Sequence, residues 1–403
     1  MFEHLFFTLS VILVFARILW EFFVNKGKIS PLAIYSFCYL YFCFGPYLAD
    51  VLGFGIYSGI QRDYMDEAAF VFFLAIATLA LFPSNFVAKL DMPYRLVIKE
   101  PVLVKQITRL LLTVPVALLF ALALAKIGFA PLDKVQRIAA VGIFHYVILT
   151  LWPLCLFCYL TVAPKHALSR GEAWSFAAII LLYFSYCFYM GERDFALIGV
   201  PLVFWFYKDK PLPLWKLSVG VVVAAVGFTL MSAGRSSEFD GGGLASFLNQ
   251  GSNLMVTTNI ILWLEQGQLV SWGASYFSSF INMLTLGAIK LTTPLSIWFS
   301  REYSPAANDG AFGFSIEGEA LINFGIAGIP FLFAFIAFFL AWTYRGFLQN
   351  RPMGVLLTYY ALFYFVYAIR GESLILFKAF IYSVIIFVGL LFISQRGRLY
   401  FQV

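Results

Sequence analysis

The stretch GIAGIPFLFAFIAFFLAWTY, residues 325–344, carries no charged side chain over its whole length. A helix needs about 20 apolar residues to cross the hydrocarbon core of a bilayer, so this stretch is long enough to span a membrane. Ten further predominantly apolar stretches are candidate spans, at 4–24, 31–53, 68–88, 107–128, 140–163, 173–190, 195–207, 216–233, 353–369 and 373–394, of which 195–207 is short. Together they predict an all-α polytopic membrane protein with about 11 transmembrane helices, forming a single membrane domain over 1–403.

The composition agrees with this prediction. Hydrophobic residues make up 62% of the chain and charged residues 12%, so a soluble domain could not cover its surface with polar groups. The net charge of +6 is too modest to predict a nucleic-acid partner. All five cysteines lie in apolar stretches, which argues against a disulfide framework, and we interpret the CxxC pair Cys155 and Cys158 as packing residues.

Positive charge marks one side of the membrane. If the spans alternate in direction, most basic loop residues fall on one side, which the positive-inside rule makes cytoplasmic. They are Lys26, Lys28, Arg95, Lys99, Lys105, Lys165, Arg170, Lys208, Lys210, Lys216, Arg345, Arg351, Arg396 and Arg398. The external side receives 59–67, the loop around Asp133, 191–194, 234–324 and 370–373. Lys134 and Arg137 fit poorly because they place positive charge outside.

The large external loop 234–324 contains two patterned stretches. Apolar residues between Leu244 and Leu264 recur with a rough helical period, and residues 272–289 are rich in aromatic residues and serine. We interpret both as amphipathic helices at the outer interface. Alternatively they form a pair of extra spans, which would leave the sidedness of the remaining chain unchanged.

The polar stretch REYSPAANDGAFGFSIEGEALINFG, residues 301–325, leads into the span quoted first. If it is helical from Ser315, then Ser315, Glu319 and Asn323 share one face, whereas Glu317 points to nearly the opposite side. This spacing predicts a functional polar stripe that includes Glu319. The alternative is a solvated loop whose acidic residues favour a helix N-terminus.

Four arginines lie at the external ends of spans or in the large loop: Arg193, Arg235, Arg301 and Arg370. The planar, always-charged guanidinium suits bidentate contact with phosphate, so their grouping predicts an anionic ligand. Lys378 strengthens the prediction because it lies two turns from Arg370 on about the same helical face. The alternative is that each arginine reaches lipid head groups or pairs with a neighbouring acid.

Within the first span, Arg17 and Glu21 stand four residues apart and predict an internal ion pair. No histidine falls in the external loops, because His145 lies in the middle of a span, His4 at the terminus and His166 in a cytoplasmic loop. An external general base would therefore be a carboxylate, and Glu319 is the first candidate. Further candidates are Glu317, Asp309 and Glu192.

The sequence predicts neither a metal site nor a cofactor. The acidic pairs at 317/319 and 192/194 are spaced two residues apart, which points the side chains apart on a helix. There is no P-loop, no GxSxG and no dinucleotide-binding fingerprint, so nucleotide hydrolysis and serine esterase chemistry lack support.

The string YSPAANDGAFGFSIEGEALINFGIAGI, residues 303–329, resembles the region before a late transmembrane helix in Wzy-type O-antigen polymerases. There a G-x-G-F-S stretch precedes an acidic residue and an N-F-G. The matching residues here are Gly310 or Gly313, Phe314, Ser315, Glu317, Glu319, Asn323, Phe324 and Gly325. GERD at 191–194 and Arg370-Gly371 resemble the family's layout. Arg301 departs from its arginine-glycine spacing, since eleven residues separate it from Gly313.

The resemblance implies a metal-independent, cofactor-free glycosyltransferase of the class C membrane type in the bacterial inner membrane, active at the periplasmic face. It would move a growing glycan from undecaprenyl pyrophosphate onto a new lipid-linked repeat unit in lipopolysaccharide biosynthesis, beside a chain-length regulator protein. Glu319 would be the base, and Arg193, Arg235, Arg301 and Arg370 would bind pyrophosphate. The expected substrate-binding residues are Glu317, Asn323, Lys378, Asp309 and Tyr303.

Three alternatives remain open at this point. An O-antigen ligase-like transferase would use another acceptor, although no external histidine points that way. A transporter or flippase of the lipid-linked unit predicts inverted repeats and charges near the bilayer midplane, whereas the charges here collect at the outer ends of the spans. Finally, the catalytic acid could lie in the first external loop, at Asp63 or Asp66.

Overall fold

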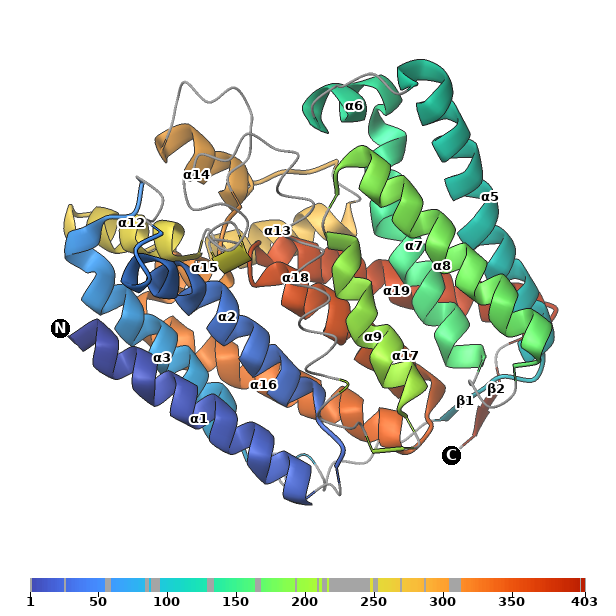
Figure 1. Ribbon diagram of the computed structural model, residues 1–403, viewed down its shortest axis with the longest axis horizontal. Helices are drawn as coiled ribbons and strands as arrows, with labels where there is room; N and C mark the ends of the chain where they lie inside the picture. The colour runs from blue at the N-terminus through green and yellow to red at the C-terminus, as the bar shows by residue number, and fades with distance from the viewer. Residues whose placement is uncertain are drawn as a thin grey trace. The chain divides into compact units, whose positions relative to one another are not determined.

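The computed structural model describes residues 2–24, 27–54, 59–83, 87, 95–128, 134–163, 168–192, 194–208, 210–211, 216, 247–248, 253–268, 270–285, 288–303, 313–398 and 400–402. These residues are mostly helical (Figure 1), which confirms the predicted all-α class. The exception within them is a pair of short antiparallel strands, β1 (Arg95–Val97) and β2 (Tyr400–Gln402).

Among the described residues, eight helical segments are long and apolar enough to cross a membrane. They contain α1 (Phe2–Val24), α2 (Pro31–Val51), η1 and α3 (Arg62–Tyr64, Met65–Leu81), α5 (Pro101–Ile127), α7 (Ile143–Val162), α8 (Arg170–Met190), α15, η4 and α16 (Ile316–Phe324, Gly325–Ala327, Gly328–Leu348) and α19 (Ser373–Ser394). All eight correspond to predicted spans, so the chain is a multi-span membrane protein.

Two more predicted spans, 195–207 and 353–369, correspond to shorter apolar helices. The first contains η3 (Asp194–Ile198) and α9 (Gly199–Phe206), and the second contains α17 (Pro352–Tyr360), a π-helical turn (Ala361–Phe365) and α18 (Val366–Ala368). Of the remaining predicted span, 216–233, only Lys216 lies within the described residues.

The span containing α15 and α16 begins at Ile316, earlier than the predicted start at 325. Ser315 caps α15 through its side chain, which satisfies one of the free N–H groups at the helix start. Glu317 and Glu319 interrupt the apolar pattern in the sequence, yet both are buried and hydrogen-bonded. The end of the predicted loop 234–324 is therefore helical and belongs to the spanning segment, with a break in the helix at Gly325, whose φ is 61°.

Contacts between residues divide the chain into two compact units. Unit 1 comprises Met1–Leu90, Asp209–Tyr344 and Tyr364–Lys378, and unit 2 comprises Asp91–Lys208, Arg345–Phe363 and Ala379–Val403. Each unit combines three separate stretches, so no single cut of the chain separates them.

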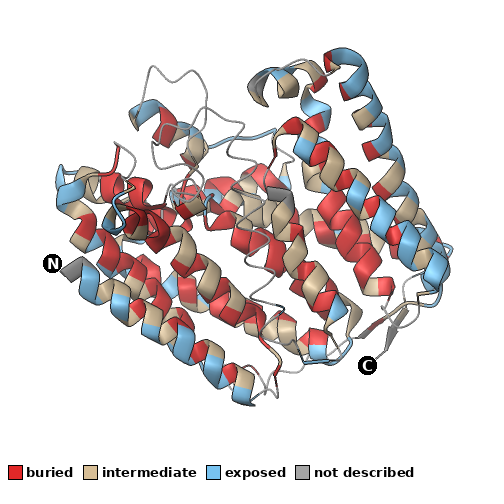
Figure 2. Cartoon of the chain, viewed as in Figure 1, coloured by how far each residue is buried: buried red, intermediate tan, exposed pale blue. Residues whose placement is uncertain are grey.

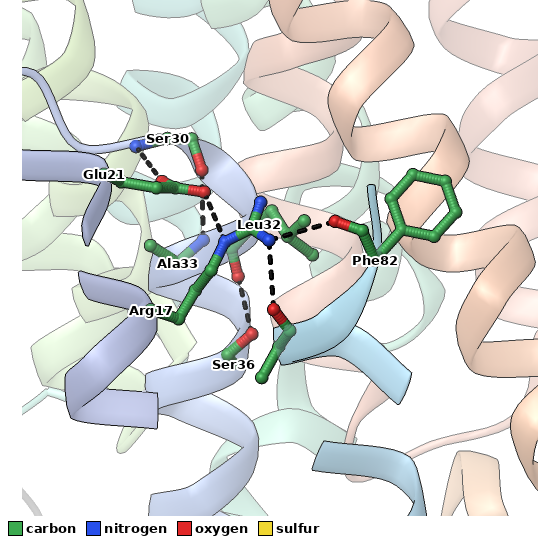
Figure 3. A network of polar contacts seen from close by, with 8 residues as sticks. Arg17, Glu21, Ser30, Leu32, Ala33, Ser36 and Phe82 are labelled. Carbon is green, nitrogen blue, oxygen red and sulfur yellow. Dashed lines mark hydrogen bonds and ion pairs between the residues drawn. The ribbon is translucent and has the colours of Figure 1, made fainter. Parts of the chain in front are cut away.

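In unit 1, α1, α2 and α3 pack together and are joined by Arg17 and Glu21 (Figure 3). Arg17 Nε donates to Glu21 Oε1 at 2.7 Å, which confirms the predicted ion pair. Arg17 Nη1 also donates to the carbonyls of Ala80 and Phe82 at the end of α3, both at 3.0 Å. Glu21 Oε2 accepts from Ser30 N, the N-cap of α2, at 3.2 Å. This pair therefore fastens three helices.

Two helices of unit 1 fall in the stretches predicted as interfacial. The first eight residues of α12 (Asn253–Glu265) are all buried (Figure 2), so α12 lacks the solvated face of an interfacial helix. Its polar residues find partners inside the fold, which the apolar pattern did not reveal. By contrast, α13 (Ala274–Leu284) buries serines and exposes Phe277, Phe280 and Leu284, an arrangement suited to contact with lipid.

In unit 2, α5 packs against α7 and α8. Trp152 of α7 stacks on Tyr183 of α8 with ring centroids 3.7 Å apart. Glu172, in the first turn of α8, forms ion pairs with Lys105 and Arg109 of α5. These contacts fix the helices that lead into the turn with Glu192.

Candidate functional site

Glu319 lies at the centre of a buried polar network in unit 1. Its Oε1 accepts from the hydroxyls of Ser275 at 2.8 Å and Ser373 at 2.7 Å, and its Oε2 accepts from Ser373 N at 2.6 Å. Asn323 Nδ2 donates to Ser275 Oγ at 2.7 Å. Glu319 and Asn323 thus share one face, as their spacing predicts, and that face contacts α13 and α19.

Glu317 has different neighbours, again as predicted from its spacing. Asn253 Nδ2 donates to Glu317 Oε1 at 2.9 Å and to the Ile369 carbonyl at 2.7 Å. Thr257 Oγ1 lies 3.5 Å from the same Glu317 oxygen, at the limit of a hydrogen bond. Glu317 therefore joins α15 to α12, whereas Glu319 joins α15 to α13 and α19.

Close packing of α15 on α12 depends on Gly318. A Cβ built at Gly318 would lie 2.9 Å from Ile260 Cδ1, 3.0 Å from Val256 Cγ1 and 2.7 Å from the capping oxygen of Ser315. Both acids consequently enter the interior on a helix that approaches α12 through a residue without a side chain.

Glu372 forms the second part of the network. Its Oε2 accepts from Leu295 N at 2.6 Å and its Oε1 from Ser296 Oγ at 3.1 Å, at the start of α14 (Leu295–Tyr303). Burial raises the pKa of Glu372, while these hydrogen bonds and nearby Lys378 offset part of that rise. Since Ser373 binds Glu319, the turn at 370–373 connects α13, α14, α15 and α19.

Two of the predicted phosphate-binding arginines lie on segments held by this network. Arg370 is exposed, and its guanidinium carbon lies 5.8 Å from the ring centroid of Phe42. Arg301 is exposed at the end of α14. Neither forms an ion pair with another described residue. Lys378 lies within electrostatic range of Glu372 and Lys290, so positive charge accompanies the same turn.

Tyr303 is half-buried and stacks on Phe299 with ring centroids 5.5 Å apart. Its hydroxyl occupies the space beside Gly59, where an added Cβ would lie only 1.4 Å from the phenol oxygen. The remaining predicted site residues, Arg193, Arg235 and Asp309, lie outside the described residues.

A groove of about 700 Å³ lies in unit 1, within the size range of small-ligand sites. It is lined by Phe6, Asp66, Glu67, Phe70, Val71, Ile261, Leu264, Glu265, Leu321 and Ile326. Asp66, one of the alternative catalytic acids, therefore borders an open groove, and Asp63 is exposed on η1. Glu319 in contrast has no exposed surface.

In unit 2, Glu192 forms a separate buried cluster. Its Oε1 lies 3.0 Å from His145 Nε2 and its Oε2 accepts from Lys134 Nζ at 2.8 Å. Burial would raise the pKa of Glu192, but His145 and Lys134 outweigh it and hold the pKa below its ordinary value. Lys134 and Arg137, which fit the predicted sidedness poorly, both bind the end of α8, because Arg137 Nη1 donates to Tyr189 O.

His145 was predicted in the middle of a span, but it lies in the first turn of α7. Sequence reasoning also missed the neutral partners of the acids: Ser275, Ser373 and Asn253. Serine and asparagine inside apolar stretches were the available signal. Among the described residues, no group of three or more His, Cys, Asp or Glu side chains is placed to hold a metal ion.

Comparison of the chain with known protein families, curated proteins and solved structures finds no match.

Proposed function

We propose that the chain transfers a glycan from a polyprenyl pyrophosphate carrier to a lipid-linked repeat unit, as an oligosaccharide repeat-unit polymerase of the bacterial inner membrane. The substrate is an anionic amphiphile, so its enzyme needs cations at the membrane surface and a carboxylate near the acceptor hydroxyl. Cations that neutralise a departing pyrophosphate stabilise charge developing in the transition state.

The observation that carries the proposal is the turn at 370–373. Glu372 binds the start of α14, the helix that has exposed Arg301 in its last turn, and Ser373 binds Glu319. Exposed Arg370 begins the same turn. The guanidinium groups of Arg301 and Arg370 thus belong to segments that one buried network holds in place. A preorganised phosphate site requires such fixed positions. The motif at 303–329, which contains Glu319 of this network, supports the same reaction.

We assign Glu319 a positioning role, which competes with the predicted role as base. Both of its oxygens are already hydrogen-bonded, so an acceptor hydroxyl would have to displace Ser275 or Ser373. Asp66 lines the groove and is the alternative base. General base catalysis contributes about 10²–10⁴-fold, so loss of the true base should be severe.

The test uses purified protein in nanodiscs, given only lipid-linked repeat units. We expect a ladder of products, which becomes about 10²-fold slower to form in Arg370→Ala and in Arg301→Ala. Arg398→Ala, an exposed arginine at the predicted cytoplasmic end, is the matched control and should retain the wild-type rate. Absence of a ladder without a different acceptor would favour a ligase-like transferase instead.

Comparing Asp66→Asn with Glu319→Gln separates the two base assignments. If Asp66 is the base, Asp66→Asn abolishes turnover while substrate affinity stays near wild type. Glu319→Gln then weakens both turnover and affinity, because the turn with Arg370 loses its anchor.

A transporter of the lipid-linked unit is the second candidate, favoured by the buried acids Glu317 and Glu319 in a spanning segment. It predicts flipping of the lipid-linked unit across vesicles without any change in glycan length. Flipping that persists in Glu319→Gln, with no ladder in any variant, would replace the polymerase proposal.

A further inference from the structure

Two neighbouring buried side chains each have an unpartnered oxygen. Glu317 and Asn253 are fully buried and joined by the hydrogen bond from Asn253 Nδ2 to Glu317 Oε1 at 2.9 Å. Within the described part of the chain, the other oxygen of each group, Glu317 Oε2 and Asn253 Oδ1, has no hydrogen-bond partner. Such atoms are rare in native proteins because they lose hydration without compensation.

A carboxylic acid and an amide satisfy each other in a closed ring of two hydrogen bonds. The amide N–H donates to one carboxyl oxygen, and the acid O–H donates to the amide oxygen. The first of these bonds is present between Asn253 and Glu317. A proton on Glu317 Oε2 would make that oxygen a donor, and Asn253 Oδ1 is an acceptor without a partner. An ionised Glu317 would leave two acceptors unsatisfied.

Within the described ranges, no cationic side chain lies close enough to Glu317 to form an ion pair with an ionised carboxylate. The titratable groups around the pair are Tyr35, Tyr39 and Cys43 from α2, and the Ser315 side chain also lies beside the carboxyl. Asn253 contacts the Ile369 carbonyl, which is followed by exposed Arg370. The Tyr39 hydroxyl is close to the carboxyl but meets no hydrogen-bond geometry at Oε2. Among the described residues, no lysine or arginine forms an ion pair with Glu317.

We propose that Glu317 and Asn253 form a proton-binding site, in which Glu317 Oε2 takes one proton from a hydronium ion of the solvent and its new O–H donates a hydrogen bond to Asn253 Oδ1. One O–H bond of the hydronium ion breaks and leaves water, while the carboxylate becomes a neutral carboxylic acid. The site holds α12 to α15 without a buried charge. Asn253 extends it to the Ile369 carbonyl, one residue before Arg370. This inference does not depend on the proposed transfer reaction.

The same substitution at two acids of one helix provides the decisive test. Glu317→Gln supplies an amide N–H that donates permanently to Asn253 Oδ1, so its thermal midpoint in nanodiscs should equal or exceed that of wild type. Glu319→Gln is the matched control and should lower the midpoint, because its amide nitrogen would face the donors Ser275 and Ser373. A Glu317→Gln midpoint as low as that of Glu319→Gln, or failure of Glu317→Gln to fold, overturns the proposal.

Infrared spectroscopy measures the proton directly. At neutral pH, wild type should show a protonated carboxyl C=O band that shifts in D₂O and disappears in Glu317→Gln. The band should persist in Tyr39→Phe, whereas an ionised Glu317 held by the Tyr39 hydroxyl would give no band.

A second experiment excludes a sodium ion at the same site. The thermal midpoint of wild type should not change when Na⁺ is replaced by choline. A Na⁺-dependent midpoint lost in Glu317→Gln would identify a sodium site and overturn the proton assignment.

Discussion

At the residue scale, the buried acids differ in how their charge is balanced. Glu319 and Glu372 accept hydrogen bonds from neutral groups, whereas Glu192 and Glu21 have cationic partners. Isolated buried charge is costly, so each arrangement must provide charge or donors within the fold. The type of partner then determines how each acid responds to pH.

Glu192 gives a pH prediction. Its pKa is lowered in the folded protein, so its contribution to stability is complete above the unfolded pKa of about 4.3 and is lost as the pH falls through the folded value. Glu192→Gln should therefore cost about 1–3 kcal/mol at pH 7, and this difference from wild type should shrink below about pH 4. Unfolding in detergent across pH 3–7 measures it. The control is Glu302→Gln, which removes an exposed acid and should change the free energy of unfolding at pH 7 by less than about 0.5 kcal/mol.

At the element scale, the position of α15 depends on contacts far along the chain. Helix spacing alone predicts that Glu319 and Asn323 share a face and that Glu317 does not. It does not predict the partners, because Ser275 lies 44 residues before Glu319 and Asn253 lies 64 residues before Glu317. Which helices meet is determined by tertiary packing, which helix spacing does not predict. For the same reason the sequence predicted α12 to be an interfacial helix, although its first eight residues are buried.

Substitution of Gly318 tests whether α15 must pack closely on α12. Gly318→Ala places a methyl group within 3.0 Å of Ile260, Val256 and the Ser315 oxygen, and overpacking of this kind typically costs about 1–3 kcal/mol. Thermal unfolding of the variant should show the loss. The control is Gly389→Ala, because nothing lies within 4 Å of the added Cβ in α19. A helical Gly→Ala change without a clash should be neutral or stabilising.

At the scale of the whole molecule, the apolar stretches could be predicted because the cost of placing a polar residue in lipid accumulates residue by residue. That pattern located every long helical segment now seen. It began the span at residue 325 instead of Ile316, because two acids interrupt the apolar run and a hydropathy scale counts each of them as an unpaired charge. The fold removes that cost with hydrogen bonds that the pattern does not register.

Cysteine labelling can determine which side of the membrane each helix end faces. The positive-inside rule predicts that the end of α14 is external and that the C-terminal segment is cytoplasmic. Glu302→Cys should react with a membrane-impermeant maleimide in intact cells, whereas Arg398→Cys should react only after permeabilisation. Both positions are exposed in the structure. Reaction of both from the outside would invert the sidedness and place the arginines on the cytoplasmic face.

The hydrogen bonds from Arg17 to Glu21, Ala80 and Phe82 have a consequence for the assembly of the protein in the membrane. The two carbonyl acceptors lie 63 and 65 residues later in the chain, so they do not yet exist when a ribosome has synthesised only the first helix. Glu21, four residues away, is present from the start and lets that helix enter the lipid as a neutral pair. The remaining donors of Arg17 stay available until α3 is inserted. Insertion of the first helix and its final locking are therefore separate events in the assembly of the protein.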